Sequence, residues 1–501
     1  MENDEGYPWI DNIRTGMNAC SLEVLRNFDN DIYEATKYEF MNAHPLIIGC
    51  YELNEYSSDG NSRKGEMRLY MVEVNEKMNE YHDKGRNESI SVSFCNKHHM
   101  ISFSNDEKEQ KKDSPVHCCK MEAGVLDGKW FQRCPIYVYN DSQSKTNQLK
   151  NRCYPTRQHL YATACASGNI LIHALKFKHN EDATKPASAC FYMEPLILTY
   201  PTRTLPSKPI CLSLDLDEST IDIQSGTGCA KIVSSYSDGS LAIHTVHFSS
   251  EKKPTIQENN RWKAHSLFRG KAPAEVWTCC WAQSKNNLKD RPGPCNLLLS
   301  GGDDGILKGW DSYTGRPIFQ IGEEEHGAGV TAVSWHPTIS TVFASGSYDE
   351  GVRIWDVQEM TDSGFSDSLK FCATNHKPRS QPRKIASIDS CGGGIWRLKW
   401  HPTDPSKLLV AVMHGGCRVL HIPALKEPRK ERNNDDTTLT FGDNEKINFF
   451  QSLFTAHDSM AYGADWLVTK NEPSSQSMTG YDIAASCSFY DQNAFLWQTN
   501  F

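Results

Sequence analysis

The chain has 501 residues, a formal net charge of −9 and hydrophobic residues at 38% of its positions. This mildly acidic balance disfavours nucleic acid or an anionic membrane as the main partner and suits a cationic or neutral ligand. The 18 cysteines show no Cys-x-x-Cys spacing, which argues against a zinc ribbon and a disulfide framework. The N-terminus lacks the apolar core of a signal peptide, and no run of about 18 apolar residues follows. We therefore expect a cytoplasmic protein, with the nucleus left open as a second location.

Short segments of alternating apolar residues recur along the first half of the chain, and such alternation predicts β-strands. The first group covers residues 31–40, 45–53 and 66–74. The second group covers 124–130 and 161–176, and the third covers 211–220 and 230–246. Each group ends before a turn-rich stretch, so each is expected to form one small sheet.

Two later segments share one detailed pattern. They are LLLSGGDDGILKGWDSYTG at 297–315 and VFASGSYDEGVRIWDVQ at 342–358, each with small residues, an aspartate turn and a closing Trp-Asp. Small residues suit a strand near a crowded axis, and the pattern is typical of a WD40 blade in a β-propeller. In the second segment we expect a hydrogen-bonded tetrad of His326, a serine of SGS, Asp349 and Trp355.

Two further modules follow, at 391–422 and 457–500, and bring the total to seven. We therefore predict an all-β fold, a single seven-bladed WD40 β-propeller over 17–501 with 1–16 as an N-terminal extension. The last module lacks an outer strand, which we expect residues 20–27 to supply, because this pairing removes a free edge. Long charged loop insertions are predicted at 76–116, 141–158, 359–386 and 425–448.

Three large aromatic residues occupy the same predicted position. Alignment of the first strand of each module places Trp277, Trp396 and Tyr462 in register, near the end of the central channel. The neighbouring turns carry acidic residues, among them Asp304 and Asp349. Aromatic rings beside carboxylates suit a quaternary ammonium group, which ring faces attract by about 0.5 to 2 kcal/mol per contact. The alternative is structural, with aromatic residues packed between blades and aspartates that hold their turns.

His414 stands where the other turns carry aspartate, in the segment VAVMHGG. Histidine side chains titrate near neutral pH, so this residue is a candidate general base. Arg397, next to Trp396, is a candidate to hold a carboxylate or an oxyanion, or else to join blade edges. Motifs for a metalloprotease, a nucleotide loop or a nucleophile elbow are missing, so we expect no metal and no cofactor.

The motifs LLLSGGDDGILKGWD, ASGSYDEGVRIWD, GGGIWRLKWHP, VAVMHGG and YGADW together resemble the WD-repeat diphthine methylesterases, often named diphthine methyltransferases. The resemblance implies hydrolysis of the methyl ester of diphthine on translation elongation factor 2, which gives diphthine and methanol during diphthamide biosynthesis. Diphthine carries a trimethylammonium group beside the ester, which agrees with the aromatic residues.

We therefore expect His414 to activate water and Asp349 to orient it. Trp277, Trp396 and Tyr462 are expected to hold the trimethylammonium group, with Arg397 and Asp304 as further substrate contacts. One alternative is an acyl-enzyme formed on Ser347 or Cys417. Another is a non-catalytic WD40 adaptor for elongation factor 2 modification or for another complex.

Overall fold

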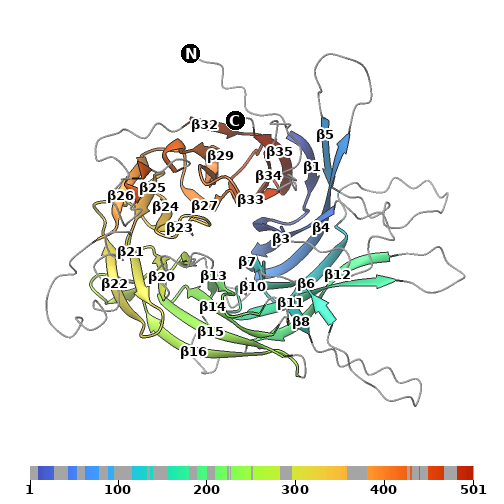
Figure 1. Cartoon of the computed structure of the whole chain (residues 1–501), viewed down its shortest axis with the longest axis horizontal. Helices are drawn as coiled ribbons and strands as arrows, with labels where there is room; N and C mark the ends of the chain where they lie inside the picture. The colour runs from blue at the N-terminus through green and yellow to red at the C-terminus, as the bar shows by residue number, and fades with distance from the viewer. Residues whose placement is uncertain are drawn as a thin grey trace, which may run out of the picture.

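Alternating strands fold into seven sheets that form a ring. The computed structural model describes residues 9–26, 43–53, 63–77, 89–94, 115–132, 136–138, 156–179, 189–199, 209–222, 225, 227–249, 252–282, 296–357, 381–425, 429–430, 439–440, 450–467 and 482–499. Within these ranges, seven sheets of four or five strands surround a common axis (Figure 1). The innermost strands contact one another in a closed cycle. The predicted all-β, seven-bladed propeller is confirmed.

We number the sheets as blades 1 to 7 in chain order. Blade 1 contains β2 (Ala19–Val24), β3 (Ala43–Leu53), β4 (Arg63–Lys77) and β5 (Ser89–Phe94), with β6 (His117–Met121) also paired to β4. Blade 2 contains β7 (Val125–Trp130), β10 (Leu160–Cys165), β11 (Ile170–His179) and β12 (Ala189–Leu198). Blade 3 contains β13 (Cys211–Asp217), β14 (Gly228–Tyr236), β15 (Ser240–Phe248) and β16 (Thr255–Lys263).

Blades 4 to 7 repeat the same antiparallel order. Blade 4 contains β19 (Thr278–Trp281), β20 (Leu297–Gly301), β21 (Leu307–Asp311) and β22 (Arg316–Ile321). Blade 5 contains β23 (Val330–Trp335), β24 (Val342–Ser347), β25 (Val352–Asp356) and β26 (Arg383–Ile388). Blade 6 contains β27 (Ile395–Trp400), β28 (Lys407–Val412), β29 (Gly416–His421) and β32 (Phe450–Phe454). Blade 7 contains β33 (Ala461–Leu467), β34 (Asp482–Ser488), β35 (Asn493–Thr499) and β1 (Trp9–Arg14).

Three small hairpins accompany the blades. They are β8 (Ile136–Val138) with β9 (Thr156–Gln158), β17 (Ser266–Leu267) with β18 (Ala272–Pro273), and β30 (Arg429–Lys430) with β31 (Leu439–Thr440). Two 3-10 turns, η3 (Met413–Gly415) and η4 (Pro423–Leu425), are also present among the residues given above. In the described part of the chain, no helix has the length and hydrophobicity needed to span a membrane.

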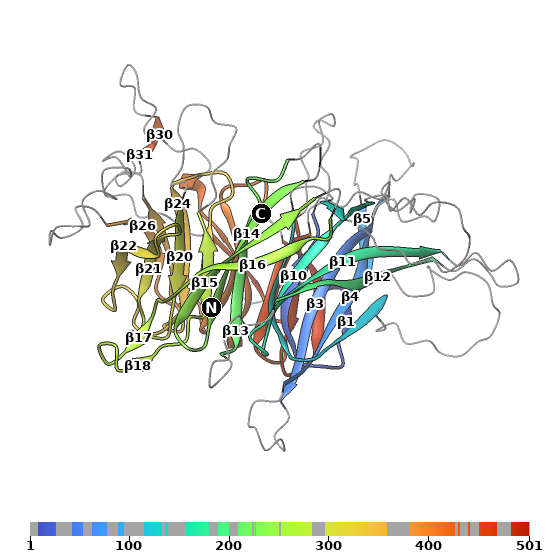
Figure 2. The ribbon, with the colours of Figure 1, turned by 90° about the horizontal axis from the view of Figure 1, so that it is seen from below.

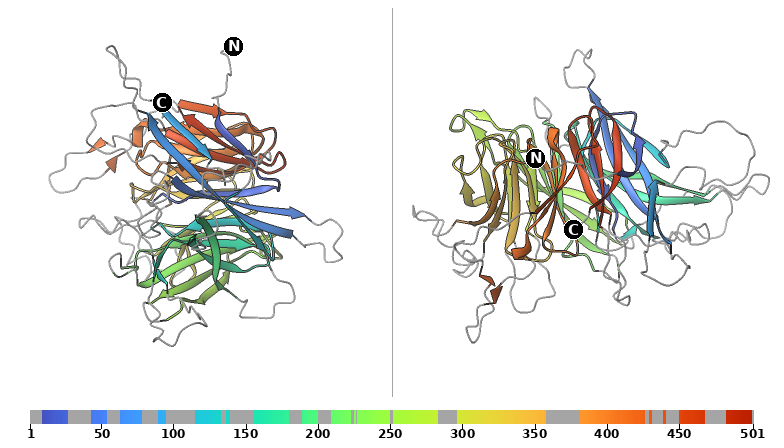
Figure 3. Two further views of the ribbon diagram at one scale, coloured as in Figure 1. Left: turned by 90° about the vertical axis from the view of Figure 1, so that its right-hand side faces the viewer. Right: turned by 90° about the horizontal axis from the view of Figure 1, so that it is seen from above.

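The ring closes through an N-terminal strand, but not the predicted one. β1 (Trp9–Arg14) pairs antiparallel with β35 and becomes the outer strand of blade 7, so most of the predicted extension 1–16 belongs to the propeller. Residues 20–27 were predicted for this role. Instead, β2 pairs with β3 as the innermost strand of blade 1, a strand that we had expected at 31–40, outside the described residues. Figure 3 shows the blue N-terminal strands beside the red last blade.

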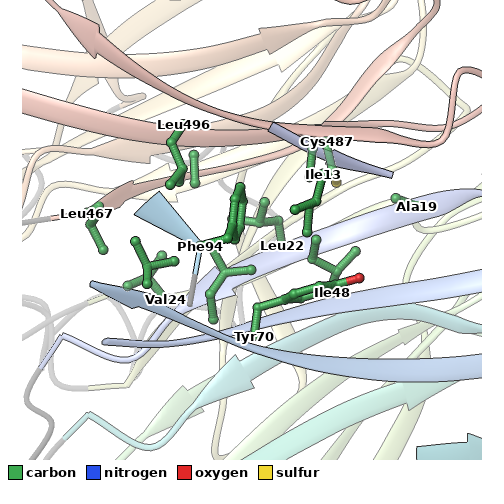
Figure 4. Close-up of a cluster of buried hydrophobic side chains, with 14 of the residues drawn as sticks. Ile13, Ala19, Leu22, Val24, Ile48, Tyr70, Phe94, Leu467, Cys487 and Leu496 are labelled. Carbon is green, nitrogen blue, oxygen red and sulfur yellow. The ribbon is translucent and has the colours of Figure 1, made fainter. Parts of the chain in front are cut away.

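A buried apolar cluster seals this closure. Ile13 of β1 and Leu496 of β35 pack with Leu22, Ile48 and Tyr70 of blade 1 (Figure 4). Successive residues of a strand point to opposite faces, so Ala494 and Leu496 of β35 join this cluster while Phe495 and Trp497 are buried on the other face, against blade 6. The chain ends of blade 7 and blade 1 are thereby joined by packing as well as by strand pairing. Most of each predicted insertion lies outside the described residues, apart from short parts such as β5 and β9.

Candidate functional site

The innermost strands carry a β-bulge at the same place in six blades. The register shift leaves one residue out of the pairing in each case: Cys20, Leu126, Leu212, Thr331, Trp396 and Tyr462. In blade 4 the equivalent residue is Trp277, which directly precedes β19. A bulge re-aims a side chain and often lies beside a functional site. We call these seven residues the mouth ring.

A second ring comes from equivalent positions at the end of the second strand of each blade, which lie within β3 in blade 1 and one or two residues after the strand in the other blades. Its members are Tyr51, Ala166, Ser237, Asp303, Tyr348, Met413 and Phe489. In six blades the backbone N–H of the second-ring residue donates to the carbonyl of the residue two positions before the mouth-ring residue of the same blade. Tyr348, for example, donates to Gly329, two positions before Thr331, at 3.0 Å. The hydrogen bond ties the end of the second strand to the start of the first. The two rings are therefore held at one end of the propeller.

Three aromatic rings from three blades converge there. The ring centroids of Trp277 and Trp396 lie 5.8 Å apart, those of Trp277 and Tyr348 6.2 Å, and those of Tyr348 and Trp396 6.1 Å. Tyr462 extends the group, since it stacks on Trp396 at 4.8 Å. All four side chains are half-buried. We call Trp277, Tyr348 and Trp396 the aromatic triangle. A cation above it can lie within about 6 Å of all three ring centroids, the range in which cation–π attraction acts.

Carboxylates lie on the side of Tyr348. Burial, together with the charges of Asp303 and Glu275, raises the pKa of Tyr348 to about 12. A Cβ at Gly329 would lie 3.2 Å from the Asp303 carboxylate and 3.4 Å from the Tyr348 ring, so both flank the same backbone. Asp303 is exposed. The aromatic triangle thus has negative charge beside it, which increases its attraction for a cation.

A network of buried charges crosses the axis below the mouth ring. Arg397 of blade 6 lies 3.2 Å from Asp127 of blade 2 and donates to the Leu126 carbonyl at 3.2 Å. Glu23 of blade 1 accepts from Lys129 at 2.9 Å and also pairs with Lys399 of blade 6. Burial alone would raise the pKa of Asp127, but Arg397 and Lys129 lower it overall.

This network determines the place of Arg397. Arg397, which we predicted as a substrate contact, lies directly beneath the mouth ring, where it forms an ion pair with Asp127. Alternating residues of the innermost strands supply the network, which balances its charges and thereby makes burial tolerable. A ligand in the mouth, the opening that the two rings surround, therefore has a charged floor beneath it.

His414 lies on the same face, in the η3 turn of blade 6. Ser345 pairs with Arg353 in blade 5, and Val410 pairs with Arg418 at the equivalent position in blade 6. Asp349 and His414 lie midway between the two members of these pairs, so His414 is the counterpart of Asp349. Because Val410 replaces the serine, blade 6 has no polar tetrad to engage the turn. His414 is exposed, and no hydrogen bond or ion pair to its imidazole is present among the described residues. The side chain is therefore available to a ligand.

Two glycines explain the unusual run at 392–394. A Cβ at Gly393 would lie 3.2 Å from the Gly415 backbone nitrogen and 3.4 Å from that of His414. A Cβ at Gly394 would lie 3.0 Å from the Met413 sulfur and 3.1 Å from the Tyr348 ring. The run therefore lets the η3 turn pack closely against the strand that carries Trp396. It couples the position of His414 to that of the aromatic triangle.

The two predicted aspartates have structural roles. Asp304 bonds to His265 Nδ1 at 2.8 Å, and His265 and Trp310 both bond to Ser300, which completes a tetrad in blade 4. Burial alone would raise the pKa of Asp304, but His265 and Lys308 lower it overall. We therefore no longer place Asp304 among the substrate contacts. Its neighbour Asp303, at the second-ring position, is the carboxylate beside the aromatic triangle.

Asp349 is equally engaged. Its two oxygens accept from both terminal nitrogens of Arg353, at 2.9 and 2.8 Å, and from the backbone of Gly327 and Gly351. It does not complete the predicted tetrad, in which only His326, Ser345 and Trp355 are joined. A carboxylate with these four contacts holds its turn. We therefore do not retain Asp349 as the residue that orients a water.

The alternative nucleophiles are poorly placed. Ser347 is buried and donates to the Ala328 carbonyl at 3.0 Å. Cys417 is also buried, and burial raises the pKa of its thiol to about 12. A thiol that stays protonated is a weak nucleophile. The described residues contain no group of three or more His, Cys, Asp or Glu side chains that could hold a metal ion.

A separate cleft of about 390 Å³ lies between β6 and blade 2. Its lining includes Met121, Asn169, His173 and Leu196. None of the aromatic triangle and neither Asp303 nor His414 reaches it. Its lining also contains Glu122 in addition to His173, but it contains no Trp, Tyr or Phe ring. We therefore take the mouth as the candidate site.

Comparisons with known proteins agree with the fold and the resemblance. A family model for the WD domain, G-beta repeat, matches residues 316–356. The chain is 33% identical over 295 residues to a diphthine methyltransferase homolog of Dictyostelium discoideum, which covers 57% of this chain and 64% of that protein. It is 31% identical over 268 residues to diphthine methyltransferase of Homo sapiens, and the match covers 53% of this chain and 46% of that protein.

The diphthine methyltransferase of Schizosaccharomyces pombe is 26% identical over 294 residues, covering 58% of this chain and 65% of that protein. The chain thus matches between 46% and 65% of the length of these three relatives. The resemblance that the sequence motifs indicated is confirmed.

Proposed function

We propose that this protein hydrolyses the methyl ester of diphthine on translation elongation factor 2, and that the aromatic triangle binds the trimethylammonium group. The aromatic triangle of Trp277, Tyr348 and Trp396 is the observation that carries the proposal. A quaternary ammonium group donates no hydrogen bond, so ring faces and nearby carboxylates are the chemistry that recognises it. The names of the relatives support a role in diphthamide biosynthesis.

His414 is the proposed general base. Its imidazole takes a proton from water while the water oxygen attacks the ester carbonyl, and the carbonyl oxygen becomes an oxyanion. The intermediate then collapses and expels the methoxy group, which takes the proton from the imidazolium and leaves as methanol. The product is the carboxylic acid of diphthine, which releases its proton to the solvent to become the carboxylate, and no reactant other than water and the ester is consumed.

Tyr348 and Arg397 have supporting roles in this proposal. Because its pKa is raised to about 12, Tyr348 keeps its phenol proton and presents a neutral ring to the cation. Arg397, held against Asp127, keeps the floor of the mouth in place beneath the ester. We propose the cytoplasm as the place of this reaction, since that is where elongation factor 2 works.

Methanol release by the purified protein tests the proposal. Elongation factor 2 that carries the methyl ester is mixed with this protein alone, and its mass is followed for the loss of one CH₂. We expect methanol and the free acid to appear together. Binding without methanol would identify a non-catalytic adaptor instead, and neither binding nor methanol would remove elongation factor 2 as the partner.

A further inference from the structure

The β17–β18 hairpin, one of the three hairpins outside the blades, lies beside the candidate site. β17 and β18 lie between the outer strand of blade 3 and the first strand of blade 4. Figure 2 shows both strands at the lower edge of the molecule, beyond the neighbouring blade strands. The four residues of its tip, 268–271, are all exposed. The hairpin therefore adds little to the core of the propeller.

The tip holds an unfavourable conformation. Phe268 and Arg269 have φ of 52° and 57°, followed by Gly270 at 87°, and the Gly270 N–H donates to the Leu267 carbonyl at 3.2 Å. Positive φ is uncommon for residues other than glycine, asparagine and aspartate, and for a bulky residue it is strained. Phe268 is also 75% exposed, and a Cβ at Gly270 would meet no atom within 4 Å. No contact within the described residues explains why an aromatic residue is kept there.

The base of the hairpin is fixed to the site. The Ala274 N–H donates to the His265 carbonyl at 3.4 Å, and the Ser266 N–H donates to Asp304 at 3.4 Å. The Asp303 N–H donates to the Glu275 carbonyl at 2.9 Å. Trp277 of the aromatic triangle follows Pro273, the last residue of β18, by four positions. These hydrogen bonds fix the position of the hairpin tip relative to the mouth, so a partner that contacts the tip is positioned relative to the mouth as well.

We infer that the β17–β18 hairpin docks the folded protein that carries the modified side chain, an inference that rests on the proposed function. The apolar Phe268 fits a recess on the partner, and Arg269 and Lys271 fit carboxylates beside that recess. Because this chain carries a net charge of −9, the exposed Arg269 and Lys271 form a local cationic contact on an acidic protein, and such a contact is complementary to carboxylates. The partner surface is therefore an apolar recess flanked by aspartate or glutamate.

A double substitution separates docking from structure. Phe268→Asn with Arg269→Gly introduces the residue types that suit positive φ, so we expect a melting temperature equal to or above that of the wild type. We expect the same variant to bind methyl-ester elongation factor 2 about tenfold more weakly, as loss of an exposed anchor does. Binding of betaine methyl ester, a small trimethylammonium ester that reaches only the mouth, should be unchanged.

Tyr313→Ala provides the matched control. Tyr313 is 87% exposed in the turn between β21 and β22, at the opposite end of β21 from the mouth, and its removal should leave binding of elongation factor 2 unchanged. Wild-type affinity in the hairpin variant, with weaker binding in Trp396→Ala, would overturn the docking inference and leave the proposed function standing. Weaker binding in the hairpin variant with no methanol from the wild type would support docking and reject the esterase.

Discussion

Trp396 stacks on Tyr462, with ring centroids 4.8 Å apart and ring planes inclined by 27°. The two residues occupy bulged positions in neighbouring blades, and Trp396 also contacts Trp277, two blades away from it in the other direction. One side chain thus links the rings of blades 4, 6 and 7. This makes Trp396 the residue whose loss should affect the mouth most.

Trp396→Ala should weaken binding of betaine methyl ester about tenfold, because it removes one cation–π partner and the ring that positions two others. Isothermal titration calorimetry measures the affinity directly. Trp396→Phe keeps an aromatic face, so it should recover most of the binding. Equal affinities for wild type and Trp396→Ala would rule out the aromatic triangle as the cation site.

Gly394→Ala should weaken the same binding about fivefold, or roughly 1 kcal/mol. Its added methyl group would lie 3.0 Å from the Met413 sulfur and 3.1 Å from the Tyr348 ring, so one of them must move. Gly327→Ala is the control, since its Cβ would lie at ordinary contact distances of 3.6 and 3.8 Å from Asp349. The same affinity in both variants would show that close packing at Gly394 does not position the triangle.

Asp303 and Asp304 should give opposite phenotypes although they are neighbours. Asp304→Ala removes the partner of buried His265 and should lower the free energy of unfolding by roughly 2–4 kcal/mol. Asp303→Asn should leave stability unchanged and weaken betaine methyl ester about threefold, because an exposed charge acts on the cation through solvent. Urea unfolding and calorimetry on both variants test the pair, and reversed effects would contradict the assignment.

Acid should destabilise the fold through its buried histidines. Burial lowers the pKa of His173 from 6.5 to about 4, so the folded protein binds this proton more weakly than the unfolded chain. Stability is therefore complete above about pH 6.5 and is lost as the pH falls toward 4, by roughly 3 kcal/mol for this residue. In His173→Leu, unfolding curves should show a shallower loss over this range. A slope identical to the wild type would show that His173 does not contribute.

The sequence was sufficient for the propeller because the repeated turn and the closing Trp-Asp mark blades 4 and 5, and weaker copies of the same strand order occur in the other blades. It misplaced the closing strand, since WIDNIR at 9–14 is short and partly charged, while the better alternation at 20–27 belongs to a central strand. Alignment of the first strands found Trp277, Trp396 and Tyr462. Tyr348 was missed because the residue after each second strand was not compared between blades.

The aspartates show a different limit. Asp303 and Asp304 are adjacent in sequence, and only the direction of each side chain shows which one faces His265. The charged floor under the mouth was missed for the same reason. Its members are polar residues of central strands, and their partners lie in blades far apart in the chain, as with Glu23 and Lys399.

The central claim is that the mouth recognises a quaternary ammonium group by its charge. Calorimetry with betaine methyl ester and with methyl 3,3-dimethylbutanoate, in which carbon replaces the charged nitrogen, tests it most directly, because the two esters have the same shape. We predict that the charged ester binds at least about tenfold more tightly. Equal affinity for the two esters, or no binding of either, would contradict the account.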